Sequence, residues 1–114
     1  MFILSTHTLD ATTGSDAKGV QVTLCAVMPD KSKKIIWAEK TDSEGRLNKE
    51  FPLGKEYSES GFILTFSIAS YFKKHPTELR TSEISLDINL SKPNTKYHFP
   101  IILSPFGASL WWSN

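Results

Sequence analysis

Apolar and polar residues alternate along most of this chain with the period of a β-strand. In segment 84–90 every second residue is Ile or Leu, and the residues between them are Ser, Asp and Asn. This pattern predicts a strand that buries one face. Segments 61–69 and 20–28 alternate in the same way, and segments 2–9 and 34–41 are also rich in strand-forming residues. A short strand is expected from Arg46 onward, and two more within 97–114, joined at Ser104-Pro105.

Turn-forming residues separate the predicted strands. A polar loop fills 10–19, a break follows residue 28, and Asp-Ser-Glu-Gly at 42–45 is typical of a tight turn in which Gly takes a positive φ. One short helix is predicted at 70–75, with Ser70 as its N-cap and Pro76 as its stop. Seven or eight short strands with one helical turn predict an all-β fold, an antiparallel β-sandwich formed as a single domain over residues 1–114.

Composition narrows the classes of function. The formal net charge of +1 gives no general attraction to nucleic acid or to an anionic membrane, so we expect neither as a partner. The single cysteine, Cys25, excludes an internal disulfide, and we expect it to be packed rather than catalytic. The start lacks the features of a signal peptide, and no apolar stretch is long enough to span a bilayer. We therefore expect a cytoplasmic protein; a peroxisomal one is the alternative, although a Ser-Lys-Leu ending is absent.

Two of the three histidines lie in predicted strands, on mixed faces that point away from the apolar core. Histidine is the usual general acid or base, so His7 and His98 are candidate catalytic residues; the alternative is a structural role. His75 precedes Pro76 in a Lys-rich loop, and we expect it to be exposed to solvent. Arg46 follows the 42–45 turn, where it can bind a carbonyl-rich or anionic ligand by two parallel hydrogen bonds, or simply pair with a carboxylate.

The C-terminal hairpin is predicted to bring the chain end beside one of these histidines. If Leu103 and Ala108 face each other across the turn, the pairing continues until His98 lies opposite Ser113. Other chemistries have no support, because the sequence contains no zinc-ligand spacing, no Gly-rich phosphate loop and no Gly-x-Ser-x-Gly elbow.

Three segments occur in the order and at the separations found in one enzyme family. They are Ser-Thr-His-Thr-Leu-Asp at 5–10, Thr-Asp-Ser-Glu-Gly-Arg at 41–46 and Tyr-His-Phe-Pro-Ile-Ile-Leu-Ser-Pro-Phe-Gly at 97–107. Together they resemble 5-hydroxyisourate hydrolase, the transthyretin-related enzyme of urate breakdown. Segment 62–72 also looks like that family's strand-then-helix segment, so the resemblance covers nearly the whole chain.

The resemblance implies a fold, an assembly and a reaction. The fold is a transthyretin-like sandwich, assembled as a homotetramer (a dimer of dimers) with active sites in the channel between dimers and with no metal or organic cofactor. The reaction is hydrolysis of 5-hydroxyisourate to 2-oxo-4-hydroxy-4-carboxy-5-ureidoimidazoline in purine degradation. The matched site residues are His7, Arg46 and His98. On this basis His98 helps to deprotonate the attacking water, Arg46 holds the ligand's carbonyl oxygens, and His7 orients the ligand or donates a proton; the assignment between the two histidines stays open.

The chain departs from the family at its end. The family typically ends in Tyr-Arg-Gly-Ser, and the corresponding residues here, which we expect to contact the substrate, are Trp111, Trp112, Ser113 and Asn114. The family's arginine falls at Trp112, so an anion-binding fork is lost and a large apolar surface is gained. We expect the tail to narrow or reshape the channel; alternatively it packs at the subunit interface without effect. Two other functions stay open: a transthyretin-like carrier of a hydrophobic small molecule in the inter-dimer channel, and an inactive tetrameric scaffold.

Overall fold

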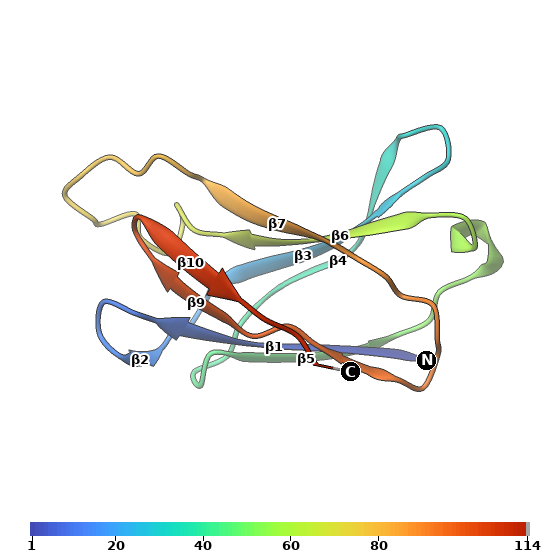
Figure 1. The fold of residues 1–114 in the computed structure, drawn as a ribbon, viewed down its shortest axis with the longest axis horizontal. Helices are drawn as coiled ribbons and strands as arrows, with labels where there is room; N and C mark the ends of the chain where they lie inside the picture. Colours follow the sequence, from blue (N-terminus) through green and yellow to red (C-terminus); the bar gives the residue numbers. More distant parts are fainter. Residues whose placement is uncertain (114) are drawn as a thin grey trace.

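The computed structural model describes residues 1–113 and consists of two β-sheets packed face to face (Figure 1). One sheet is antiparallel throughout, in the order β4-β3-β6-β7. The other is built around β1, which has β5 and β2 on one side and β8 and β9 on the other, with β10 beyond β9. The strands are β1 (Phe2–Asp10), β2 (Ser15–Asp16), β3 (Gln21–Val27), β4 (Lys33–Lys40), β5 (Arg46–Phe51), β6 (Gly61–Ser67), β7 (Glu83–Ile88), β8 (Lys96–His98), β9 (Ile101–Ser104) and β10 (Gly107–Leu110).

The all-β sandwich predicted from the alternation is confirmed, with ten strands rather than seven or eight. One extra strand is β2, which forms inside the polar loop that follows β1. The other arises because the strand expected from residue 97 is interrupted at Phe99-Pro100, where Pro100 has no N–H to give to the ladder. The register of β1 is the same against β8 and against β9, so the interruption does not shift the pairing.

The pairing of β1 with β8 and β9 is parallel, in contrast to the antiparallel arrangement that we expected throughout. Every other strand pair is antiparallel. The N-terminal strand and the C-terminal strands therefore lie side by side within one sheet, as the blue and orange-red ribbons of Figure 1 show. This parallel pairing positions the candidate site.

The short helix predicted at 70–75 is wrong, because this segment forms a series of turns. Its helical character is limited to single main-chain hydrogen bonds, such as that from the Phe72 N–H to the Ile68 carbonyl at 3.0 Å. The helical segment of the structure is instead a short 3-10 helix, η1 (Lys55–Tyr57).

His75 is half-buried rather than exposed to solvent, so that prediction is also wrong. Its ring packs edge-to-face on Phe106, with ring centroids 5.5 Å apart. Phe106 lies in the β9–β10 turn, so the turn supplies the cover that the Lys-rich sequence around His75 did not suggest.

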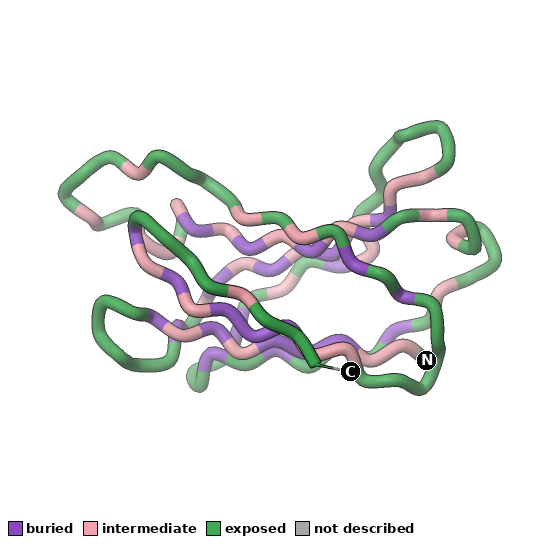
Figure 2. The backbone as a smooth tube through the Cα atoms, in the orientation of Figure 1, coloured by how far each residue is buried: buried purple, intermediate pink, exposed green. Residues whose placement is uncertain are grey.

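The core lies between the two sheets, where the buried segments of Figure 2 face each other. Alternation along β1 and β3 places every second side chain in it, as predicted. Cys25 is half-buried and makes no disulfide. No helix within residues 1–113 is both long enough and apolar enough to cross a membrane. Fully buried side chains include Leu4, Val20, Val22, Leu24, Leu64, Phe66, Ile101 and Leu103.

Candidate functional site

The outer face of the β1 sheet gathers the three side chains that were matched as catalytic. His7 of β1 lies directly opposite Arg46 of β5. His98 of β8 lies beside Ser5 of β1, two residues before His7. Because residues at i and i+2 of a strand share a face, and paired residues of neighbouring strands do too, all three side chains project from the same face. The structure thus brings His7, Arg46 and His98 together.

Arg46 is presented by a tight turn that is bonded to β1. One carboxylate oxygen of Asp42 accepts the main-chain N–H of Glu44 and of Arg46, each at 2.9 Å. These bonds, that of Arg46 first, lower the pKa of Asp42 below its ordinary value. The Gly45 carbonyl accepts the main-chain N–H of Thr8 at 2.7 Å and its hydroxyl at 3.0 Å. The start of β5 is therefore fixed beside His7.

The guanidinium of Arg46 is available to a ligand. The side chain is exposed, and within residues 1–113 it makes no hydrogen bond or ion pair. An arginine whose main chain is fixed and whose guanidinium has no partner can bind carbonyl or carboxylate oxygens through two parallel N–H groups.

His7 has an acidic partner from the neighbouring strand. Its Nε2 lies 2.9 Å from the Oδ1 of Asp16 on β2, and the side chain is 20% exposed. The β1–β2 hairpin that supplies Asp16 pairs Leu9 with Asp16. This contact fixes the ring and leaves Nδ1 as the nitrogen that can meet a ligand.

His98 lies in a different environment from His7. Its Nδ1 is 2.7 Å from the hydroxyl oxygen of Ser5. Burial lowers the pKa of the His98 imidazole below the ordinary 6.5, and the positive charges of Lys96, Arg46 and His7 lower it further. A neutral imidazole beside a free guanidinium is the combination that a general base and an oxyanion-stabilising group need.

The register predicted for the C-terminal hairpin is confirmed. Leu103 pairs with Ala108, and beyond β10 the pairing resumes as a bridge between His98 and Ser113. Between these pairs the Trp111 N–H donates to the Pro100 carbonyl at 3.3 Å. The tail therefore runs beside His98; Asn114, which was also expected to contact substrate, lies outside the described residues.

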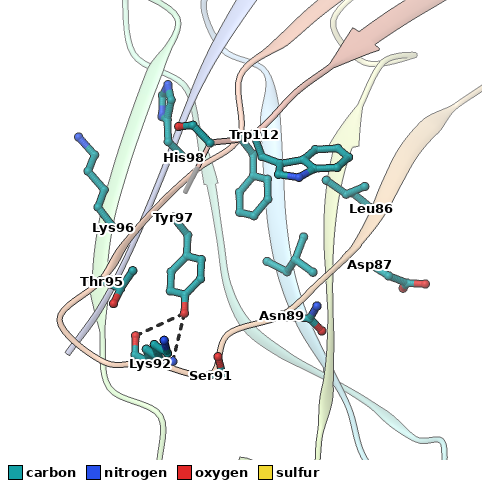
Figure 3. A pocket seen from close by; sticks show the side chains of 13 residues that line it. Leu86, Asp87, Asn89, Ser91, Lys92, Thr95, Lys96, Tyr97, His98 and Trp112 are labelled. Carbon is teal, nitrogen blue, oxygen red and sulfur yellow. Dashed lines mark hydrogen bonds between the residues drawn. The ribbon is translucent and has the colours of Figure 1, made fainter.

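The two tryptophans of the tail face opposite sides of the sheet. Trp111 is bonded to Pro100, which shares a face with His98, so Trp111 belongs to the face of the histidines. Trp112 turns the other way, toward Leu86 of β7, while His98 and Lys96 point away from it (Figure 3). Both tryptophans were expected to contact the substrate, but the structure places them on opposite faces of the sheet.

Trp112 lines a hollow of about 650 Å³ between β7 and β8 (Figure 3). Tyr97 points into the same space, and its hydroxyl contacts the main chain of Lys92. His98 and Ser113 also line this hollow, so it adjoins the strand of the candidate base, whereas Arg46 and His7 are not among its lining residues. Within residues 1–113, no three His, Cys, Asp or Glu side chains gather closely enough to hold a metal ion.

Sequence reasoning missed Ser5, Asp16 and Lys96 as members of this site. Strand alternation puts Ser5 on the face of His7 and Lys96 on the face of His98, so their positions could have been read from the pattern. Their contacts could not, because they depend on the parallel pairing of β1 with β8. Asp16 carried no signal within a polar loop.

Comparison with known proteins decides the family. The model of the family described as HIUase/Transthyretin matches residues 4–112. This chain belongs to that family. The fold agrees, since transthyretin from Sparus aurata superposes with a TM-score of 0.82 over 96% of this chain and 95% of that one, at 17% sequence identity.

Two relatives of this chain and one solved structure carry the same name. The chain is 32% identical over 113 residues to the 5-hydroxyisourate hydrolase of Salmonella dublin, covering 96% of this chain and 79% of that protein. It is 30% identical to the Deinococcus radiodurans 5-hydroxyisourate hydrolase, covering 95% of this chain and 92% of that protein. The structure of Klebsiella pneumoniae 5-hydroxyisourate hydrolase superposes with a TM-score of 0.78 at 25% identity, and all of both chains is covered.

Proposed function

We propose that this protein hydrolyses 5-hydroxyisourate, opening the ring amide to give 2-oxo-4-hydroxy-4-carboxy-5-ureidoimidazoline in purine degradation. The main support for the proposal is that His7, Arg46 and His98 lie on one face of the sheet. The relatives named 5-hydroxyisourate hydrolase add to it. The alternative, a carrier for a hydrophobic molecule, is not favoured, because binding an apolar ligand would not need these three polar side chains.

His98 acts as the general base. In its neutral form it accepts a proton from water, whose oxygen then forms a bond to the ring carbonyl carbon. Burial and the nearby positive charges keep the imidazole neutral near pH 7, since both lower its pKa. His98 is assigned this step because its imidazole is kept neutral, whereas Nε2 of His7 is bonded to the carboxylate of Asp16.

Arg46 and His7 act on the other two atoms of the reacting amide. The guanidinium of Arg46 donates to the carbonyl oxygen and stabilises the negative charge that develops on it. When the C–N bond breaks, the leaving nitrogen needs a proton, and a protonated His7 can give it from Nδ1, because Nε2 is bonded to Asp16. The proton taken by His98 then passes to solvent, and His7 takes up a proton from solvent, so both histidines regain the forms in which they began.

The proposed active unit is a homotetramer of single-domain chains in the cytoplasm. The exposed face of β1, β5 and the tail would line the channel between dimers, where the large apolar surface of Trp111 would meet a second copy or the substrate. A mass four times the 12.8 kDa of one chain, measured by light scattering, is the expected result.

The direct test of the function uses freshly made 5-hydroxyisourate. Urate oxidation supplies the compound, and its ultraviolet absorbance is followed with and without the protein. We expect decay faster than the spontaneous rate, in proportion to protein concentration. Decay that no amount of protein accelerates would remove the proposed function.

The pH profile should show the lowered pKa of His98. Because the base must be neutral, kcat/KM should fall as pH decreases, and the midpoint of the fall should lie below 6.5. The measurement is the initial rate at saturating and limiting substrate from about pH 5 to about pH 8. An acid limb centred at or above 6.5 would contradict the assigned environment.

Substituting the two tryptophans separately should separate their effects. Trp111→Ala removes an aromatic surface from the face of His98 and should raise KM by about two- to tenfold, the range expected of one aromatic contact. Trp112→Ala alters the hollow behind that face and should leave KM within about twofold, although the protein loses packing. Because residue 112 points away from the face of His98, Trp112→Arg should not raise activity either. If Trp112→Ala raised KM more than Trp111→Ala, Trp112 rather than Trp111 would lie on the face of His98 in the working enzyme.

A further inference from the structure

Ser5 makes the closest polar contact to the candidate base, and it has no part in the reaction described above. Its hydroxyl oxygen lies 2.7 Å from Nδ1 of His98, and the residue is 5% exposed although it lies on the outer face of β1. The parallel register places Ser5 directly beside His98. The contact joins residues 93 positions apart in the sequence, so it exists only in the folded sheet.

The proton on the His98 ring decides whether that ring can act as a base. A neutral imidazole carries one proton, on Nδ1 or on Nε2, and the hydrogen bond of one nitrogen selects the form. When Nδ1–H donates to the Ser5 oxygen, Nε2 keeps a lone pair for a proton from water. When the Ser5 hydroxyl donates to Nδ1 instead, Nε2 already holds the proton and cannot accept another.

The reaction favours donation from Nδ1 of His98. The Ser5 hydroxyl oxygen lies 2.7 Å from Nδ1, and a hydroxyl can accept as well as donate, so the geometry suits this direction. Donation from Nδ1 survives the proton transfer unchanged, because an imidazolium carries hydrogen on both nitrogens. No bond has to be reversed during the reaction, which is the condition for a preorganised base.

The main chain directly after His98 is held by two hydrogen bonds to β1. The Phe99 N–H donates to the Ser5 carbonyl at 2.9 Å, and the Thr6 hydroxyl donates to the Phe99 carbonyl. The freedom left to His98 is therefore rotation of its ring, and the Ser5 hydroxyl is the group that limits it.

We propose that Ser5 is a positioning residue that holds the proton of neutral His98 on Nδ1 and turns Nε2 toward the substrate. The inference rests on the proposed hydrolase function for its effect on rate, but its effect on the ring is independent of any substrate. Ser5 itself touches no reacting atom.

The test compares Ser5→Thr with Ser5→Val in the full chain. These side chains have nearly the same shape and both suit a strand, but only Thr keeps the hydroxyl. We expect Ser5→Thr to keep kcat within about threefold and Ser5→Val to lower it by about 10- to 100-fold, the cost of a misplaced catalytic group, with KM nearly unchanged. Ser85→Ala is the control, because it removes a hydroxyl from a similar pair, Ser85 with Thr65, in the other sheet.

The nitrogen chemical shifts of His98, measured by NMR above its titration range, supply the second readout. In the parent protein and Ser5→Thr, Nε2 should have the shift of a bare nitrogen, and in Ser5→Val the two nitrogens should move toward a mixture of forms. A rate loss without such a change would make Ser5 merely structural and overturn the inference. If the parent protein does not hydrolyse 5-hydroxyisourate, the proposed function fails, while the shifts alone still decide the role of Ser5.

Should Ser5→Val not fold, Ser5→Ala replaces it, since Ala creates no crowding beside the ring. Unchanged nitrogen shifts in Ser5→Ala would refute the inference. A shift toward the mixed form would support it.

Discussion

Replacing His98 with glutamine should lower kcat/KM for 5-hydroxyisourate by about 10²- to 10⁴-fold, the contribution of a positioned general base. Glutamine keeps a polar side chain that can still contact Ser5, but it cannot take a proton from water. The acid limb of the pH profile should disappear from the residual activity, because the group that produces it is gone. Absorbance decay of the substrate across the pH range measures both effects.

The matched control for His98→Gln is His75→Gln. His75 is also half-buried, but it packs on Phe106 and does not belong to the face of His7 and Arg46. This control should keep kcat/KM within about twofold, and its pH profile should match that of the parent protein. If the two variants lost activity equally, the loss would reflect the fold rather than proton transfer, and His98 would not be the base.

Replacing Gly45 with alanine should strongly destabilise the protein and also impair the site. Gly45 has a φ of +72°, which costs a residue with a side chain about 1–3 kcal/mol. A Cβ at this position would also clash with the Thr8 carbonyl oxygen on β1, so the turn must move. Because the turn carries Arg46, kcat/KM should fall together with the free energy of unfolding.

Gly14→Ala separates the two causes of that destabilisation. Gly14 has nearly the same φ, +74°, but a Cβ there meets nothing within 4 Å. Urea unfolding should therefore give a loss of about 1–3 kcal/mol for Gly14→Ala and a larger loss for Gly45→Ala. Equal losses would mean that the turn tolerates the added methyl group, and the close packing of Gly45 on β1 would then have no role in placing Arg46.

The sequence predicted those parts of the fold that depend on local pattern. Alternation located the strands, and turn chemistry located the 42–45 turn. The Leu103–Ala108 pairing was supposed for the hairpin, and counting back from it led correctly to the His98–Ser113 bridge. The family resemblance then picked out His7, Arg46 and His98, which the folded sheet places on one face.

The rest depended on contacts between distant segments. Parallel pairing of β1 with β8 has no local signature, so the contact of Ser5 with His98 was invisible until the strand order was known. The 70–75 segment has a helix cap and a stop, but the structure uses Tyr71 elsewhere: its hydroxyl donates to Asp10 at the end of β1. Burial, together with the bonded carboxylate of Asp10, raises the pKa of Tyr71 to about 12, because both disfavour the phenolate.

The parallel pairing of β1 with β8 and β9 also sets when the site can form during synthesis. The residues of β1 leave the ribosome before the other strands, and β5 can pair with one edge of β1, but the other edge and the Ser5 hydroxyl have no partner until residue 98 has been made. Contacts over such separations in sequence slow folding, because a long segment must be ordered before they are gained. The β3–β6–β7 part of the other sheet can assemble earlier, while β1 waits with an unpaired edge. Hydrolytic activity should therefore be the last property that a newly made chain acquires. Its appearance would report that β1 has paired with β8 and β9.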